Sequence, residues 1–281
     1  MTGPSGPRVS EYMHRQLETL SEETTAAVAA ARMRDQRIGS LLVESLNRPQ
    51  RDCRITGIVT ETDLIVKVMA KGLDASTTTL GQIMSSPLLT IAADRPMLDS
   101  GHLMDQRHVR HLAVTEGNDI VGIVSVRDLV RHFMQADSGP VQALNDVYRP
   151  LSILMRTDIA TIDTRDSLAS AIEVMAARKI GSVFVREAGE LVGILTETDI
   201  VRRAMAEKND PKTVTVGSLL TYPLLDIDVN RSIRDACEVM TKQQVRHLAV
   251  TDKQKIVGVI SIRDLVKMAA ARDRPEFLRR S

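Results

Sequence analysis

The chain is organised around the stretch Gly193–Asp199, GILTETD, because the same pattern occurs four times. Each copy has a glycine, a hydroxyl residue three positions later and an aspartate three positions after that. The other copies are Gly57–Asp63, Gly122–Asp128 and Gly258–Asp264. Aliphatic residues precede each hydroxyl residue and apolar residues at helical spacing follow each aspartate, which predicts a buried strand leading into a helix. Four such junctions predict four repeats.

The motif has a structural interpretation and a functional one. A hydroxyl residue followed three positions later by an acid forms a helix capping box. Such boxes usually carry Glu or Gln at the second place, whereas all four copies here carry Asp and also keep the glycine. A cap alone does not require that agreement. We therefore expect the motif to bind a ligand as well, with its hydroxyl and carboxylate groups gathered at a helix N-terminus.

The composition limits the class of protein. The 281 residues are 43% hydrophobic, which is enough for two domains with their own cores. Lys and Arg number 37 against 36 Asp and Glu, so charge gives no argument for binding nucleic acid or a membrane. No apolar run approaches the roughly 20 residues that span a bilayer, and the first residues lack the apolar core of a signal peptide. The two cysteines, Cys53 and Cys237, fit a reducing compartment, so we expect a cytoplasmic protein.

The four repeats share one plan, which is a strand, a helix, a hairpin of two strands and a second helix. Met33, Met104, Met175 and Met240 recur 71, 71 and 65 residues apart, and we expect them to fill the core side of the first helix. Repeat one has a longer turn between its hairpin strands, within residues 44–56, which we expect to be an exposed loop.

The repeats also alternate in sequence. Repeats one and three share IGS before the hairpin and TETD after it, whereas repeats two and four share VRHLAVT and RDLV. This alternation predicts that a pair was duplicated, giving two modules that each pack an odd and an even repeat about a pseudo-two-fold axis. The expected division is a flexible tail 1–8, a module 9–136 with repeats 9–72 and 80–136, a linker 137–149, and a module 150–273 with repeats 150–208 and 215–273.

These features resemble those of cystathionine-β-synthase (CBS) domain proteins with four CBS repeats arranged as two Bateman modules. The resemblance extends from about Val9 to Arg272. It rests on the four motifs, the shared plan of strands and helices, and the Arg-His-Leu-Ala-Val strands. It implies an α/β fold in which each module binds adenosine-bearing ligands in clefts between its two repeats.

The resemblance also implies roles for particular residues. The motif aspartates and the hydroxyl residues before them would hold the ribose: Asp63, Asp128, Asp199, Asp264, Thr60, Ser125, Thr196 and Ser261. A carboxylate suits this role because it accepts two hydrogen bonds from a vicinal diol. The candidates for phosphate are cationic residues of the even repeats: Arg127, Arg263, Arg110, His111, Arg246 and His247. Arg offers a planar fork, and His can add charge near neutral pH.

The odd repeats lack this cationic set, because Thr62 and Thr198 replace the motif arginine. Their Gly–Ser segments would instead let the backbone come close to a base, and the first strands add a shared threonine: Gly39, Ser40, Gly181, Ser182, Thr19, Thr90 and Thr161. One cleft can then combine odd-repeat backbone with even-repeat charge. Repeat four departs with Asp226, whose carboxylate can repel phosphate, so its cleft is expected to be empty or to take another ligand.

Other classes of site have little support in the sequence. His102, His108 and His111 lie near one another in the chain, but the first two do not share a helix face and no Cys or carboxylate cluster completes a zinc site. No nucleophile elbow, Walker loop or paired acid for hydrolysis occurs. We therefore expect no enzyme, no metal and no cofactor, with an adenine nucleotide as regulatory ligand.

The expected function is that of a cytoplasmic sensor that binds AMP, ADP or ATP and passes a change of module geometry to a partner protein or a second copy. Two alternatives stay open. One is a scaffold or oligomerisation protein with unoccupied clefts, and the other is a sensor of S-adenosylmethionine or a cyclic dinucleotide. Apolar positions on the second helices predict association between the modules or in a homo-oligomer: Leu64, Val68, Leu129, Ile200 and Leu265.

Overall fold

The computed structural model describes residues 7–45, 55–135 and 150–265. Most of the expected tail, the centre of the longer loop in repeat one with Cys53, the linker 137–149 and the last residues of repeat four lie outside this part. Within the described residues, no helix is long and apolar enough to cross a membrane.

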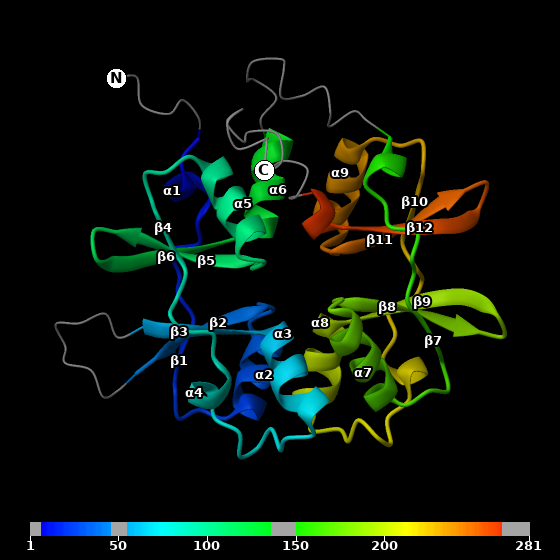
Figure 1. Cartoon of the computed structure of the whole chain (residues 1–281), viewed down its shortest axis with the longest axis horizontal. Coiled ribbons are helices and arrows are strands. Elements are labelled where there is room, and N and C mark those ends of the chain that lie inside the picture. Colours follow the sequence, from blue (N-terminus) through cyan, green and yellow to red (C-terminus); the bar gives the residue numbers. More distant parts are fainter. Residues whose placement is uncertain (1–6, 46–54, 136–149, 266–281) are drawn as a thin grey trace. The chain divides into compact units, whose positions relative to one another are not determined.

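Each repeat forms a three-stranded sheet (Figure 1). The first strand lies parallel to the middle strand, which forms an antiparallel hairpin with the last. The predicted hairpins are therefore confirmed. In chain order the strands are β1 (Thr19–Ser21), β2 (Ser40–Glu44) and β3 (Ile55–Thr60); β4 (Thr90–Ala92), β5 (His111–Glu116) and β6 (Asp119–Ser125); β7 (Thr161–Asp163), β8 (Ser182–Glu187) and β9 (Glu190–Thr196); β10 (Asp226–Asp228), β11 (His247–Asp252) and β12 (Lys255–Ser261).

A helix joins the first and middle strands of every repeat, because parallel strands need a crossover connection. These helices are α2 (Ala26–Asp35), α5 (Met97–Gln106), α7 (Leu168–Arg178) and α9 (Ile233–Gln243). Pro96 occupies the N-cap position of α5, so Asp94, a residue type that often caps helices, does not cap this one. Short helices precede the first strands: α1 (Val9–Tyr12), α4 (Leu80–Ile83), η3 (Leu151–Ile153) and η5 (Val216–Ser218).

The second helix of each repeat begins at the motif, as predicted. In the odd repeats it starts as α3 (Glu61–Asp63) or α8 (Glu197–Asp199) and continues in π-helical geometry as η1 (Leu64–Val68) or η4 (Ile200–Met205). A 3-10 turn, η2 (Met69–Lys71), completes it in repeat one. Repeat two has a regular helix, α6 (Val126–Gln135), and residues 262–265 begin the helix of repeat four.

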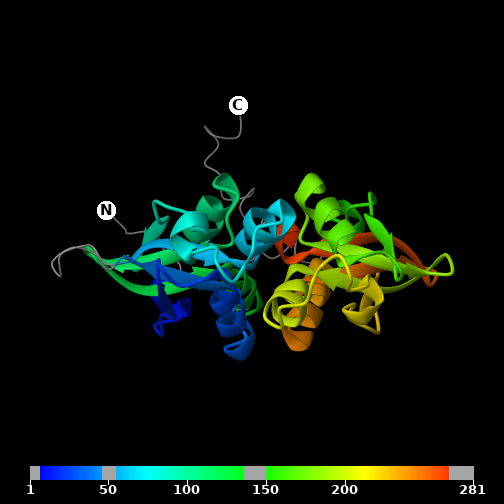
Figure 2. The same ribbon diagram turned by 90° about the horizontal axis from the view of Figure 1, so that it is seen from below.

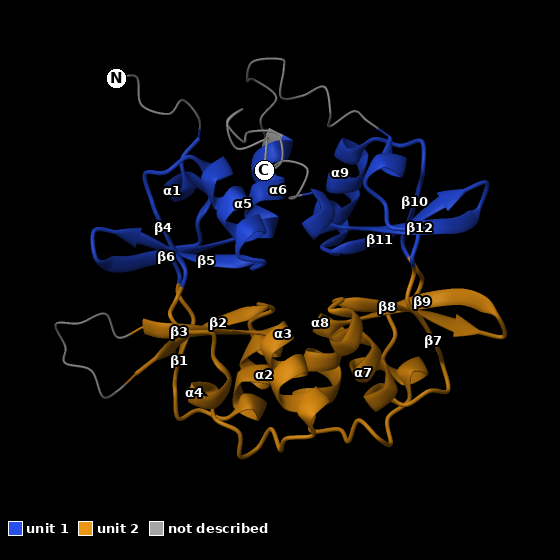
Figure 3. Cartoon of the chain, viewed as in Figure 1, with its two compact units in different colours: residues 1–16, 89–158, 225–281 blue, residues 17–88, 159–224 orange. Residues whose placement is uncertain are grey.

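The described residues form two compact units, each built from two repeats of the same sequence type (Figure 3). The even-repeat unit spans residues 1–16, 89–158 and 225–281, and the odd-repeat unit spans residues 17–88 and 159–224. Each unit has its own hydrophobic cluster. The expected chain-order modules 9–136 and 150–273 each draw one repeat from either unit, and that division stays a prediction.

Within each unit the helices pack against each other. In the odd-repeat unit α2 contacts η4, and α7 contacts η1 and η2 (Figures 1 and 2). In the even-repeat unit α6 contacts α9. These contacts bury the apolar positions that the sequence marked for association, Leu64, Val68, Leu129, Ile200 and Leu265. The four recurring methionines are also buried, at 2% exposure or less, which confirms their predicted core role.

The segment before each first strand pairs with the last strand of the neighbouring repeat in the chain. His14 pairs with Ile123 of β6, and Ser85 pairs with Ile58 of β3. Repeats three and four make the same exchange through Arg156 on β12 and Thr221 on β9. The opening segments of repeats one and two are thus exchanged, as are those of repeats three and four.

The exchanged segments explain the motif glycine. A Cβ on Gly193 would lie 2.8 Å from the carbonyl oxygen of Thr221, and one on Gly258 would lie 2.9 Å from that of Arg156. Both distances are shorter than any normal Cβ contact, so only glycine lets the backbones approach this closely. The agreement among the four motif glycines therefore has a structural cause and does not by itself indicate a ligand site.

Candidate functional site

All four motifs form the same hydrogen-bonded cap. One carboxylate oxygen of Asp63, Oδ2, accepts hydrogen bonds from the backbone N–H of Thr60 at 2.8 Å and from its hydroxyl at 2.6 Å. The other three motifs repeat both bonds within a few tenths of an ångström. The capping interpretation is therefore confirmed, and the cap uses only one of the two carboxylate oxygens.

The second oxygen, Oδ1, faces the exchanged segment in every repeat. In the odd repeats it accepts from a hydroxyl, that of Ser85 at 3.3 Å for Asp63 and that of Thr221 at 2.9 Å for Asp199. In the even repeats Oδ1 faces a side-chain nitrogen of histidine or arginine instead. The partners are His14 Nε2 at 3.0 Å for Asp128 and Arg156 Nε at 3.9 Å for Asp264.

The four aspartates differ in how fully Oδ1 is engaged. Lys67 adds an ion pair of 2.7 Å to Asp63, and Arg131 adds one of 3.2 Å to Asp128, which is 0% exposed. Asp264 makes no closer contact through Oδ1 than the one at 3.9 Å within the described residues. A ligand hydroxyl can therefore reach Asp264 with the least competition.

The odd-repeat unit also contains a pair of buried carboxylates, outside the predicted site residues, that are hydrogen-bonded reciprocally. Glu61 and Glu197 are 1% and 4% exposed. Thr198 donates to Glu61 at 3.0 Å, and Thr62 donates to Glu197 at 2.9 Å. The guanidinium of Arg202 lies 3.8 Å from Glu61. These bonds join repeat one to repeat three through the positions where the even repeats carry Arg127 and Arg263.

The Gly–Ser and Arg–His segments occupy equivalent positions, as predicted. The carbonyl of Gly39 accepts from the N–H of Glu61 at 3.1 Å, and that of Arg246 accepts from the N–H of Ile262 at 2.9 Å. A Cβ on Gly39 would lie 3.3 Å from the carboxylate of Glu61. The carboxylate of Glu61 thus occupies the space beside the Cα atom of Gly39. The role of Gly39, Ser40, Gly181 and Ser182 towards a base stays a prediction.

In the even-repeat unit, the corresponding region is cationic. Burial, followed in order of effect by the positive charges of Arg246, Arg110, Arg156 and Arg263, lowers the pKa of His247 to about 3. His247 is therefore neutral near pH 7, which corrects the expectation that it adds charge there. Its buried Nδ1 has no hydrogen-bond partner among the described residues.

The strand register places this cationic region beside the motif. His247 pairs with Ser261 across the hairpin, and His111 pairs with Ser125 in repeat two. Arg127 and Arg263 are exposed on the first helical turn, immediately before the motif aspartates. Arg246, Arg263, His247 and Asp264 therefore all lie at one strand–helix junction of repeat four.

The first-strand positions are equivalent in all repeats, as predicted, because Thr19, Thr90, Thr161 and Asp226 each begin the first strand. The carboxylate of Asp226 accepts a hydrogen bond of 3.0 Å from Thr251 on the neighbouring strand. Asp226, which replaces the shared threonine in repeat four, thus has a hydrogen-bond partner within its own sheet.

Metal and thiol chemistry find no support in the described residues. No group of three or more His, Cys, Asp or Glu side chains within residues 7–45, 55–135 and 150–265 is placed to hold a metal ion. Burial raises the pKa of the Cys237 thiol to about 12, so this cysteine stays protonated at neutral pH.

Comparison with known proteins identifies the repeats. A family model described as the CBS domain matches residues 9–70, 80–135, 151–206 and 216–271. The CBS domain-containing protein CBSCBSPB2 of Arabidopsis thaliana is 23% identical over 262 residues, covering 84% of this chain and 48% of the relative. The CBS domain-containing protein YhcV of Bacillus subtilis is 32% identical over 111 residues, covering 40% of this chain and 79% of the relative.

The chain spans about half the length of the Arabidopsis relatives that it matches. Among solved structures, protein MJ1225 from Methanocaldococcus jannaschii has the same fold, with a TM-score of 0.76 at 16% identity. The match covers 93% of this chain and 99% of that chain.

Proposed function

Since the chain belongs to the CBS domain family, we propose that it is a regulatory protein whose even-repeat unit binds an adenine nucleotide, AMP, ADP or ATP. The observation that carries this proposal is the junction of repeat four. There, four arginines lie near the partly buried His247, beside Asp264, whose Oδ1 has the most distant partner of the four motif aspartates among the described residues.

The two halves of a nucleotide suit the two parts of this junction. Oδ1 of Asp264 is an acceptor for a ribose hydroxyl, while its Oδ2 keeps the helix cap. Arg246 and Arg263 offer planar forks that suit phosphate oxygens. His247 is neutral, so one of its two ring nitrogens carries a hydrogen. That N–H group can donate one hydrogen bond to phosphate without adding positive charge.

The odd-repeat unit is less suited to phosphate. Its junction holds the buried carboxylates Glu61 and Glu197 where the even repeats have Val126 and Ile262. A phosphate brought to this place would meet like charge in a region of low dielectric constant. We therefore assign the phosphate-bearing ligand to the even-repeat unit. Asp63 and Asp199 stay candidates for a ribose hydroxyl whose phosphate lies elsewhere.

The proposed output is regulatory. Ligand binding would draw the arginines around His247 towards the phosphate and shift the packing of repeat two against repeat four, which a partner protein or a second copy of the chain could detect. A scaffold function is the second candidate. It is favoured by the finding that the motif glycines and aspartates already have structural roles in the exchanged segments and the caps.

Mass spectrometry of small molecules that copurify with the chain, followed by calorimetric titration, separates these functions. The titrants are AMP, ADP, ATP, S-adenosylmethionine and a cyclic dinucleotide. The proposal expects saturable binding of an adenine nucleotide and, at a hundredfold excess over Kd, stabilisation of the fold by about 2.7 kcal/mol. Binding of every titrant weaker than about 1 mM, or roughly −4 kcal/mol, would favour the scaffold instead.

A further inference from the structure

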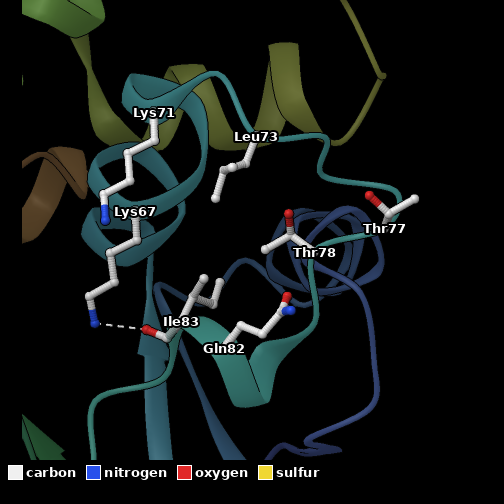
Figure 4. A pocket seen from close by; sticks show the side chains of 7 residues that line it. All are labelled: Lys67, Lys71, Leu73, Thr77, Thr78, Gln82 and Ile83. Carbon is white, nitrogen blue, oxygen red and sulfur yellow. Dashed lines mark hydrogen bonds between the residues drawn. The ribbon is translucent and has the colours of Figure 1, made fainter.

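A pocket of about 360 Å³ lies in the odd-repeat unit, between η1–η2 and the segment that leads into α4 (Figure 4). This volume falls in the range of about 300 to 1,000 Å³ that is typical of small-molecule sites. Lys67 and Lys71 form one wall, and Thr77, Thr78 and Gln82 form the opposite wall (Figure 4). Leu73 and Ile83 lie between the two walls.

The lysine wall carries more positive charge than its surroundings balance. The ammonium group of Lys67 forms an ion pair of 2.7 Å with Asp63 and donates to the carbonyl of Ile83 at 2.7 Å and to the hydroxyl of Ser85 at 3.2 Å, so its three N–H donors are engaged. Lys71 lies one helical turn further on and makes no ion pair with any described residue. Like charges one turn apart repel each other, and Asp63 offsets only one of them. An anion in the pocket would offset the other.

The opposite wall is polar but uncharged. The side-chain oxygen of Gln82 accepts from the N–H of Thr79 at 2.9 Å, so its amide NH₂ group faces outward as a donor. The hydroxyls of Thr77 and Thr78 both donate to the carbonyl of Asp74, at 3.3 and 2.8 Å. Their oxygens therefore remain as acceptors for hydroxyl groups of a ligand.

Repeat three supplies an internal comparison, because its linker has the same fold. Thr213 donates to the carbonyl of Asp210 as Thr77 does to that of Asp74. At the position of Lys71, however, repeat three carries Glu207, and at that of Thr78 it carries Val214. The cation and the hydroxyl that define the pocket therefore belong to repeat one.

We propose that this pocket binds a small phosphorylated polyol. Its phosphate accepts hydrogen bonds from the ammonium group of Lys71, its hydroxyl groups donate to Thr77 and Thr78, and its carbon chain contacts the apolar side chains between the two walls. None of the residues that line this pocket belongs to the nucleotide site proposed for the even-repeat unit, so the proposal does not depend on that assignment.

Titrations of the full chain with glycerol 3-phosphate, inorganic phosphate and glycerol at constant ionic strength test the proposal. The readouts are calorimetry and the NMR shifts of the Thr77 and Thr78 amides. We expect glycerol 3-phosphate to bind more tightly than phosphate, and phosphate more tightly than glycerol. Lys71→Glu, which introduces the residue of repeat three, should weaken both anions by about tenfold or more, because it removes a charge-assisted hydrogen bond and adds a like charge.

Two further variants sharpen the test. Lys212→Glu changes the net charge equally at an exposed lysine of the repeat-three linker, and it should bind as the wild type does. Thr77→Val, at an exposed position, should weaken glycerol 3-phosphate and leave phosphate unchanged. Absence of saturable shifts in the wild type, or equal effects of Lys71→Glu and Lys212→Glu, would overturn the site. Equal binding of phosphate and glycerol 3-phosphate in both wild type and Thr77→Val would overturn the polyol assignment.

Discussion

Thr198 and Glu61 lie 137 residues apart in the chain and are joined by a hydrogen bond of 3.0 Å. Its counterpart, from Thr62 to Glu197, measures 2.9 Å. The even repeats have no such carboxylate, since Val126 and Ile262 occupy the equivalent positions and are buried. One motif thus supports two chemistries: a hydrogen-bonded link between the odd repeats, and a cationic junction in the even repeats.

The link in the odd-repeat unit should contribute measurably to stability. Thr198→Val removes the donor to a buried carboxylate, and hydrogen bonds to charged groups are worth about 1.5–3 kcal/mol. We expect the free energy of unfolding in urea to fall by that amount. Thr213→Val, at an exposed threonine of the same unit, serves as the control. Equal stability of both variants would show that the buried hydrogen bond contributes nothing.

The motif glycine should be intolerant of a side chain. In Gly193→Ala the new Cβ would meet Leu220 and the carbonyl oxygen of Thr221, and overpacking of this kind costs about 1–3 kcal/mol. Gly101→Ala is the matched control, because its Cβ would touch only the side chain of Leu129 at 3.3 Å. Alanine also favours a helix over glycine by up to about 1 kcal/mol. A melting temperature of Gly193→Ala equal to or higher than that of Gly101→Ala would contradict the close approach of the exchanged segment.

The depressed pKa of His247 predicts how stability depends on pH. Near pH 7 the imidazole is neutral in both the folded and the unfolded chain. As pH falls below the ordinary value of 6.5, the unfolded chain binds a proton that the folded chain does not bind until about pH 3. Stability should therefore decrease progressively from pH 6.5 downwards, and less so in His247→Gln. The lowered pKa of His132, caused by burial, acts in the same direction.

NMR titration of the imidazole measures this directly. We expect no protonation of His247 in the free protein at pH 5. A bound nucleotide should raise its pKa, because phosphate offsets the charges of the surrounding arginines. A midpoint near 6.5 in the free protein would contradict the arrangement of arginines around this side chain.

Substitutions that change the side-chain length at position 264 separate the two roles of Asp264. Asp264→Ala removes both the cap, worth about 0.5–2 kcal/mol of stability, and the acceptor for a ribose hydroxyl. Asp264→Glu can keep the cap, since Glu is common at this place in a capping box, but it displaces the carboxylate from the ribose. We expect near wild-type stability with weaker binding of AMP and adenosine alike. Full nucleotide affinity of Asp264→Glu would mean that Asp264 only caps the helix.

Much of the fold follows from local sequence patterns. The strand–helix junction at Gly193–Asp199, the hairpins and the buried positions of Met33 and its counterparts depend on periodicity and on turn residues, which neighbouring residues decide. The same holds for the cap, because Thr196 and Asp199 are three positions apart. The equivalence of Gly39 with Arg110 was also visible, since both precede the middle strand at the same place.

What the sequence could not show depends on contacts between distant segments. Glu61 contacts Thr198 only because repeats one and three pack together. The one sequence signal for this contact is that both odd repeats carry the same glutamate in TETD. The exchange that places Thr221 over Gly193 likewise involves two repeats, so the structural cause of the repeated spacing of the glycine cannot be derived from one motif. The charge of His247 was misjudged because burial among arginines cannot be derived from a single strand.

Calorimetric titration of AMP and adenosine into the wild type and Arg246→Ala tests the central claim most directly. Arg186→Ala, at an exposed arginine of the odd-repeat unit, is the control, and circular dichroism confirms that each variant is folded. The account predicts that Arg246→Ala weakens AMP about tenfold, equivalent to about 1.4 kcal/mol, with less effect at high salt and little effect on adenosine. Equal loss of AMP and adenosine in Arg246→Ala, or no loss of either, would contradict a phosphate site in the even-repeat unit.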